Sequence, residues 1–231
     1  MQSATDNETA KIAAAKAAVD CIEEGMLVGL GTGSTATYFI EALITRVKET
    51  GLKIEAVATS SRSYEQAAAG GIPLLDVNDI TRLDITVDGA DEVDHQKRMI
   101  KGGGGALLRE KIIASISREM VVIIDETKLV KHLGKFPLPV EITQFASKAI
   151  IKQIHNHGFQ GELRRNKQGT LYTTDNGNYI IDIHLRYPCN EPERDHLTLN
   201  NIPGVVETGF FFNLAGRIFV GHPNGNVDII H

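Results

Sequence analysis

The chain has 231 residues, of which 42% are hydrophobic, and this suits one large domain or a large domain with a small one. Its 24 basic and 29 acidic residues give a formal net charge of −5, which argues against a general nucleic-acid binder. Two distant cysteines, Cys21 and Cys189, do not suggest a disulfide framework. No signal-peptide pattern and no apolar run of about 18 residues is evident, so we expect a soluble, cytoplasmic protein without membrane contact.

The first half of the chain alternates between the patterns of helices and strands. We predict a helix from the capping-box pair Thr5 and Glu8 to a stop at Gly25. The following segments are predicted as strand 26–30, helix 34–47, strand 54–58, helix 62–70, extended 72–77, strand 83–87, helix 106–116 and strand 120–124. Such alternation is typical of a mainly parallel sheet with helices on both faces. The predicted fold class is therefore α/β, with a Rossmann-like large domain.

The pattern changes at residues 134–139, which contain two prolines. The segments beyond are predicted as strand 140–143, helix 145–157, strand 161–165, strand 179–185, helix 191–200 and strand 205–212. This βαββαβ order predicts a smaller, ferredoxin-like α+β domain. Residues 217–220 and 227–230 are predicted to form a closing hairpin. We expect a large domain over 1–133, with 209–231 returning to it, and a small domain over 134–208.

The stretch 86–111 concentrates the residues that carry chemistry. Its strand ends at Asp88, and ligands of open α/β sheets bind at the carboxyl ends of strands. Lys101 directly precedes four glycines, whose N–H groups can approach a ligand closely because glycine has no Cβ. Glu110 lies in the first turn of the next helix, near that glycine turn. We therefore favour a functional role for Asp88, Asp91, Lys101 and Glu110.

The other acidic residues of this stretch have a simpler interpretation. Glu92, Asp94 and His95 are expected to face water, as runs of charge usually do. A magnesium site built from the acidic cluster is an alternative, but Lys101 would compete for its carboxylates. We therefore expect no metal.

Gly31 to Thr35 turns from a strand into a helix and offers an anion site. The free N–H groups and dipole of a helix N-terminus bind phosphate, and Thr32, Ser34 and Thr35 add hydroxyl donors. The turn matches neither a dinucleotide fingerprint nor a Walker loop, and an ordinary helix cap explains it about equally well. The strand ends at Thr32, Asp88 and Lys128 are expected to meet at one sheet edge, together with the Lys101 turn.

These groups suit one reaction. With a phosphate near Thr32 and a hydroxylated chain near Asp88 and Asp91, Glu110 can move a proton between the two carbons of an enediolate. Lys101 and the glycine N–H groups can stabilise the oxyanion. This is aldose–ketose isomerisation, with the division of labour that triosephosphate isomerase illustrates.

The chain resembles ribose-5-phosphate isomerase, type A, over essentially its whole length. The resemblance is carried by GLGTGSTA (29–36), TSS (59–61), VDGADEVD (87–94), IKGGGGALLREK (100–111), LGKFPLPVE (133–141), TDNGN (174–178) and IPGVVETGFF (202–211). Gly105 stands where an alanine is common in the family, and the loop 95–98 is idiosyncratic.

The resemblance implies a cofactor-free enzyme of the pentose phosphate pathway that interconverts ribose 5-phosphate and ribulose 5-phosphate. It implies Glu110 as the proton acceptor and a homodimer or homotetramer as the assembly. The family's substrate-binding positions fall on Lys11, Thr32, Gly33, Ser34, Thr35, Asp88, Gly89, Ala90, Asp91, Lys101, Gly102, Gly103, Gly104 and Lys128.

Two alternatives of related fold stay open from the residues. One is a non-catalytic domain that senses sugar phosphates, although the chain retains Glu110 and has no DNA-binding extension. The other is a coenzyme A transferase, in which a glutamate would act as nucleophile.

Overall fold

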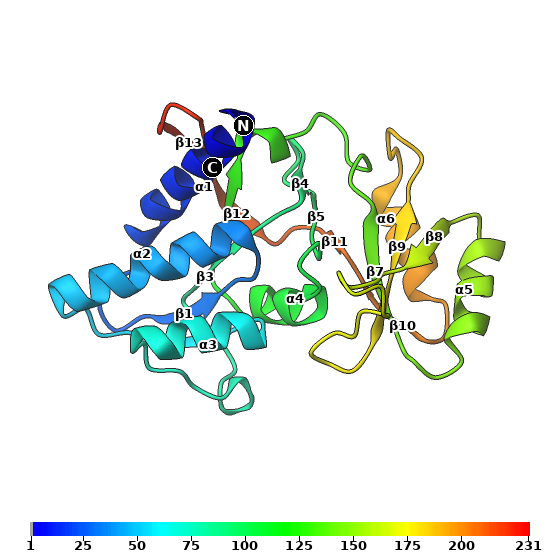
Figure 1. The fold of residues 1–231 in the computed structure, drawn as a ribbon, viewed down its shortest axis with the longest axis horizontal. Helices are drawn as coiled ribbons and strands as arrows, with labels where there is room; N and C mark the ends of the chain where they lie inside the picture. Colours follow the sequence, from blue (N-terminus) through cyan, green and yellow to red (C-terminus); the bar gives the residue numbers. More distant parts are fainter. Residues whose placement is uncertain (1) are drawn as a thin grey trace. The chain divides into compact units, whose positions relative to one another are not determined.

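A computed structural model of the chain describes residues 2–231 (Figure 1). The chain divides into two compact units. Unit 1 contains the residues up to Ala90 together with Arg109–Leu129 and Leu214–His231. Unit 2 contains Asp91–Leu108 and Val130–Asn213. No helix in residues 2–231 is long and apolar enough to cross a membrane.

Unit 1 is built on a six-stranded sheet in the order β13-β12-β6-β3-β1-β2. Its strands are β1 Leu27–Leu30, β2 Glu55–Ala58, β3 Ile85–Gly89, β6 Met120–Asp125, β12 Ala215–Gly221 and β13 Val227–Ile230. All neighbouring pairs are parallel except β12 and β13, which form the predicted closing hairpin. The α/β prediction is therefore confirmed.

Helices cover both faces of this sheet. The helices are α1 Gln2–Val19, α2 Ser34–Thr50, α3 Ser61–Gly70 and α4 Leu107–Ser115, with the short 3₁₀ helices η1 Val77–Asp79 and η2 Glu126–Lys128. α1, α2 and α3 share one apolar core with the sheet, and Figure 1 shows α1 and α2 packed beside each other. On the opposite face, Ile113 of α4 packs against Val57 and Leu83.

The first helix begins earlier than predicted. α1 starts at Gln2, so the predicted start at Thr5 is wrong by three residues. The side chain of Thr5 lies outside the described residues. The predicted extended segment 72–77 contributes only a single bridge, between Leu74 and Ala56, to the edge of the sheet.

Unit 2 has the predicted ferredoxin-like layout. Its antiparallel sheet has the order β10-β7-β9-β8, with strands β7 Leu138–Ile142, β8 Gln160–Leu163, β9 Tyr179–His184 and β10 Val205–Thr208. The helices are α5 Ser147–Asn156 and α6 Pro192–Asn200. Buried residues of both helices, including Ile150, Ile154 and Leu199, share one apolar core with β7 and β9.

One predicted strand of unit 2 is in fact two. Instead of a single strand over 205–212, β10 ends at Thr208, and β11 Phe210–Phe211 pairs in a second sheet with β5 Met99–Ile100. β5 also pairs with β4 Glu92–Val93. Gly209 makes the change of sheet possible, because a Cβ there would lie 2.3 Å from the Lys101 carbonyl oxygen.

The two compact units differ from the expected domains in the segment 91–108. We expected it in the large domain, whereas it lies in unit 2. Its strands β4 and β5 form a sheet with β11, and Ile100 belongs to the apolar core of unit 2.

Glu141 fixes a loop over the sheet face of unit 2 that lies opposite the helices. The side chain is fully buried, and its Oε1 accepts hydrogen bonds from Thr174 Oγ1 at 3.0 Å, Asn176 Nδ2 at 3.1 Å and Asn178 Nδ2 at 2.9 Å. One buried carboxylate oxygen therefore orders the turn 174–178.

We expect Glu141→Ala to lower the free energy of unfolding by about 3 kcal/mol, because buried donors lose their charged acceptor. Urea unfolding followed by circular dichroism measures this. Glu162→Ala, at an exposed position on β8 of the same sheet, is the matched control and is expected to have little effect. Equal stabilities for the two variants would contradict the role given to Glu141.

Candidate active site

Three neighbouring strands of unit 1 bring predicted site residues to the same sheet edge. β3 lies between β1 and β6, and all three run parallel. Their carboxyl ends therefore lead to Thr32, Asp88 and the segment containing Lys128. The predicted meeting of these three strand ends is confirmed within unit 1.

Asp88 is fully buried and ties β3 to the turn after β1. Its Oδ1 accepts the backbone N–H groups of Thr32 at 3.0 Å and of Gly89 at 2.7 Å. Gly31 is required beside it, since a Cβ at that position would lie 2.1 Å from the same oxygen. The close approach of backbone and carboxylate explains the glycine in this turn.

The turn after β1 ends in an open helix N-terminus. Gly33 is the cap residue of α2, with φ of 114°, and it makes no side-chain capping bond. Ser34 is the first helical residue, so the alternative of an ordinary serine cap is wrong. The first N–H groups of an α-helix have no partner within the helix, and they bind anions well.

Thr32 has a different hydroxyl environment from the one predicted. Its Oγ1 lies 2.7 Å from Thr59 Oγ1 and donates to Ser60 Oγ at 2.8 Å. Ser63 Oγ donates to the Gly31 carbonyl oxygen at 2.7 Å. This hydroxyl network holds the shape of the turn. Thr59 and Ser60 belong to the TSS motif at 59–61, whereas Ser63 lies inside α3 and no sequence motif marks it.

Glu110 lies in the first turn of α4 and is only 2% exposed. It precedes Ile113 by three residues, so both side chains lie on one helix face, and Ile113 packs against the sheet of unit 1. The carboxylate is therefore shielded from bulk water, as a base that acts on carbon requires.

Lys128 and Lys11 are the remaining predicted binding residues of unit 1. Lys128 ends η2, which begins after Asp125 at the end of β6 and is capped by an Asp125 carboxylate oxygen that accepts from the Thr127 N–H at 3.1 Å. Lys11 follows Ala10, whose carbonyl lies against Gly221 at the end of β12. Both lysines therefore belong to segments beside the carboxyl ends of parallel strands.

The glycine turn of unit 2 is closed by a bond from the Gly105 N–H to the Gly102 carbonyl oxygen at 2.9 Å. Both glycines have positive φ, 104° at Gly102 and 84° at Gly105. Lys101 is 2% exposed, and its Nζ lies 5.4 Å from the centroid of the Phe211 ring. Asp91 Oδ2 accepts the Gly103 N–H at 2.7 Å. Asp91, Lys101 and the glycines are therefore brought together within unit 2.

Two predicted solvent-facing carboxylates are buried, so that prediction is wrong for Glu92 and Asp94. Glu92 accepts the N–H groups of Gly134 at 2.7 Å and Phe136 at 2.6 Å, while Asp94 forms an ion pair with Arg98 at 2.7 Å. Burial is tolerated because each carboxylate has such partners. His95 is exposed, as predicted. No cluster of three metal-ligand residues occurs in the part of the chain that the structure describes.

The Rossmann-like sheet, the helix N-terminus and the buried carboxylates define an α/β enzyme of a small anionic substrate. The chain belongs to the ribose 5-phosphate isomerase A (phosphoriboisomerase A) family, whose model matches residues 55–225. It is 55% identical over 221 residues to ribose-5-phosphate isomerase A of Protochlamydia amoebophila, covering 96% of this chain and 95% of that protein.

Solved structures agree with this assignment. The ribose 5-phosphate isomerase A of Methanocaldococcus jannaschii matches with a TM-score of 0.91 and 38% identity, over 97% of this chain and 99% of that one. A D-ribose-5-phosphate isomerase in complex with phospho-erythronic acid matches with a TM-score of 0.90 and 39% identity, over 96% and 97% of the two chains.

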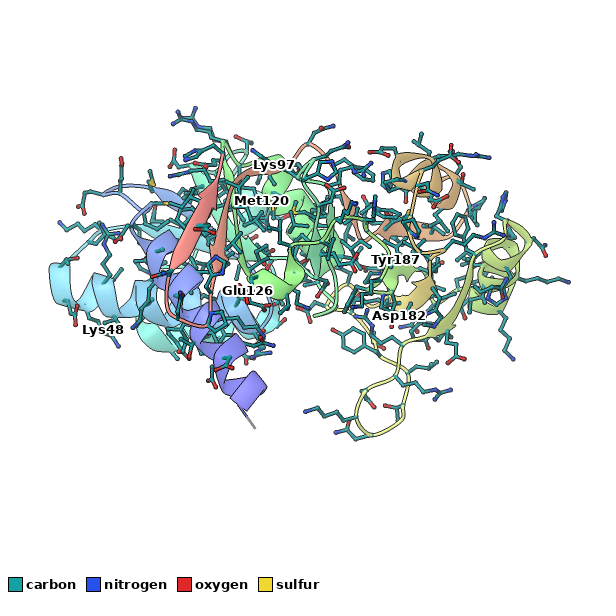
Figure 2. The ribbon with its side chains drawn as sticks, turned by 90° about the horizontal axis from the view of Figure 1, so that it is seen from above. Lys48, Lys97, Met120, Glu126, Asp182 and Tyr187 are labelled. Atoms are coloured by element: carbon teal, nitrogen blue, oxygen red, sulfur yellow. The ribbon has the colours of Figure 1, made fainter. Side chains whose placement is uncertain are left out.

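His222 links η2 to the β12–β13 hairpin, and Figure 2 labels its partner Glu126. Its Nδ1 lies 2.5 Å from Glu126 Oε2 and its Nε2 lies 2.9 Å from Asp228 Oδ2. The hydrogen bond with Glu126, followed by that with Asp228, raises the pKa of His222 above its ordinary value of 6.5. A raised folded-state pKa stabilises the fold below the unfolded-state pKa and loses that contribution as pH rises through the raised value.

Wild type is therefore expected to exceed His222→Gln in stability at pH below about 6.5, with the difference shrinking as pH rises through the raised pKa. Urea unfolding midpoints measured across this pH range test the sign. Glu126→Gln removes the first partner's charge and should remove most of the same pH dependence. A stability difference that is independent of pH would contradict the assignment.

Proposed function

We propose that Glu110 is the proton acceptor in the interconversion of D-ribose 5-phosphate and D-ribulose 5-phosphate, the reaction for which the family is named. The observation that carries this role is the burial of the Glu110 carboxylate, which is 2% exposed in the first turn of α4. A shielded carboxylate takes the proton from C2 of the aldose, which gives a cis-enediolate, and returns it to C1, while the hydroxyl proton passes from O2 to O1. No cofactor is needed for this proton transfer.

The phosphate group is assigned to the N-terminus of α2. The cap at Gly33 makes no side-chain bond, and the following N–H groups of Ser34 and Thr35 begin a helix of 17 residues. Such groups, with the dipole behind them, favour a dianion. Lys128 and Lys11 are assigned to the same end of the substrate, where local positive charge attracts an anion although the whole chain has a net charge of −5.

The hydroxylated chain is assigned to Asp88, Gly89, Ala90 and Asp91. Carboxylates accept hydrogen bonds from sugar hydroxyls, and they can also take a hydroxyl proton when the furanose ring opens. Lys101 and the N–H groups of Gly102 and Gly104 are assigned to the carbonyl oxygen, whose negative charge grows as the enediolate forms, while the Gly103 N–H holds the Asp91 carboxylate. The similar D-ribose-5-phosphate isomerase that was solved in complex with phospho-erythronic acid supports a phosphorylated, sugar-like ligand for this chain.

We further propose that the protein acts in the cytoplasm, in the non-oxidative branch of the pentose phosphate pathway, as a homodimer or homotetramer. The family assignment supports the pathway, because the pathway contains the reaction for which the family is named. Light scattering of the purified protein measures the assembly.

Glu110→Gln is expected to lower kcat by about four orders of magnitude, since an amide cannot accept the proton. The KM for ribose 5-phosphate and the inhibition constant of inorganic phosphate should change little, because the binding groups remain. Ketopentose formation from ribose 5-phosphate measures turnover. The matched control is Glu65→Gln on the exposed side of α3, which should retain wild-type kinetics. Turnover near the wild-type rate in Glu110→Gln would refute the base assignment.

The family assignment supports the isomerase and favours neither alternative function, and the purified wild-type chain tests this directly. We expect it to form ketopentose, whereas a non-catalytic sensor domain would bind the phosphosugar without turnover. A coenzyme A transferase would instead form a glutamyl thioester when it is incubated with acyl-coenzyme A. Intact-mass spectrometry detects that adduct, and we expect none.

A further inference from the structure

Two residues of the connection between β8 and β9 bind carbonyl oxygens of the glycine turn. Arg164 follows β8, and its Nη1 donates to the carbonyl oxygens of Gly102 at 2.8 Å and Gly103 at 3.3 Å. Tyr172 Oη donates to the Gly104 carbonyl oxygen at 3.4 Å. Three successive carbonyl groups of the turn thus accept hydrogen bonds from the connection between β8 and β9.

Asp182 holds the Arg164 side chain in place. Arg164 Nε donates to Asp182 Oδ2 at 2.9 Å, and Arg164 Nη2 lies 2.5 Å from Asp182 Oδ1, which makes a two-pronged ion pair. The Arg164 and Asp182 side chains are 14% and 27% exposed, so water competes little for the pair. Asp182 lies in the middle of β9, a strand paired on both sides, and it is labelled in Figure 2.

Tyr172 also contacts Arg164. Its N–H donates to the Arg164 carbonyl oxygen at 2.9 Å, so the two residues face each other across the loop that connects β8 and β9. The Arg164 guanidinium lies 5.9 Å from the centroid of the Tyr172 ring, within the range of a cation–π contact. The guanidinium is therefore fixed by a carboxylate, by a ring and by the carbonyls it binds.

The direction of the glycine carbonyl groups also fixes the direction of the N–H groups that follow them. The C=O and the following N–H of a trans peptide point in opposite directions. Among the described residues the only cis bond is Tyr187–Pro188, so the glycine turn is trans. With the Gly102 carbonyl facing Arg164, the Gly103 N–H must face away, and it meets Asp91 Oδ2 at 2.7 Å. By the same rule the Gly104 N–H also faces away from Arg164.

We propose that Arg164 is a positioning residue of the isomerase, which aims the N–H groups of Gly103 and Gly104 and, through Gly103, the carboxylate of Asp91. The proposal rests on the function proposed above, in which this turn and Asp91 bind the substrate. Successive glycines have the widest choice of backbone conformations, so they lose the most conformational entropy when one is fixed. The fork of an arginine supplies donors for Asp182 and for two carbonyls at once, which a lysine cannot do.

Arg164→Lys keeps the positive charge and removes the fork. We expect kcat for ribose 5-phosphate to fall by about tenfold to a hundredfold, the effect of displacing catalytic donors by up to an ångström. The inhibition constant of inorganic phosphate should stay at the wild-type value, because the groups proposed to bind phosphate belong to unit 1. Arg165→Lys is the matched control, since the Arg165 side chain is exposed and donates to the Gly169 carbonyl oxygen within its own turn.

Asp182→Asn tests the path from β9 to the glycine turn. It should lower kcat in the same direction, and the double variant Arg164→Lys/Asp182→Asn should lose no more than the worse single variant, because both changes remove one unit. A general loss of structure would instead weaken phosphate inhibition and lower the melting temperature together with kcat.

A wild-type kcat in Arg164→Lys overturns the proposal. Fully additive losses in the double variant, or a loss of kcat accompanied by weaker phosphate inhibition, overturn it as well. The proposed function fails separately, when the wild-type chain forms no ketopentose from ribose 5-phosphate.

Discussion

The contact between the Asp88 carboxylate and the turn that follows β1 organises the carboxyl edge of the sheet in unit 1. A fully buried carboxylate is costly unless backbone or side-chain donors surround it. Here the N–H groups of Thr32 and Gly89 supply such donors, and the missing side chain of Gly31 supplies the space. The start of α2 is thereby joined to the end of β3, so the helix N-terminus and the carboxylate keep a fixed spacing.

The same physical device recurs through the chain. Glu92 accepts two backbone N–H groups, Asp94 caps the loop that follows it, and Glu141 orders the turn 174–178. These acidic residues are therefore used inside the protein, where each carboxylate fixes a segment without regular secondary structure. Loops fixed in this way hold ligand-binding groups with little loss of precision, and such positions are common in enzymes.

The fold was largely predictable because periodicity reports burial. Uninterrupted apolar runs such as 120–124 predicted a buried parallel strand, and the βαββαβ order predicted the ferredoxin-like unit. The strand ends at Thr32 and Asp88 followed from the rule for parallel sheets. The split at Gly209 was missed, because an extended segment that changes sheets has the same pattern as one that does not.

The carboxylates show where sequence reasoning stops. Glu92 and Asp94 resemble any solvated acidic run, and their burial depends on Gly134, Phe136 and Arg98, partners that local pattern alone does not identify. The contact of Arg164 with the glycine turn spans more than sixty positions along the chain, and no local signal marks it. Tertiary hydrogen bonds of this kind require coordinates.

The change of sheet at Gly209 has a consequence for motion. The Gly209 N–H donates to the Pro139 carbonyl oxygen at 2.7 Å, and the Gly209 carbonyl oxygen accepts the Lys101 N–H at 2.8 Å. Gly209 therefore links the two sheets by hydrogen bonds. The amide hydrogens of Gly209 and Lys101 are therefore shielded from exchange with solvent until the sheets of unit 2 separate. The backbone of Lys101 is therefore tied to both sheets, while the glycines that follow it are held by side chains such as Arg164 rather than by sheet pairing.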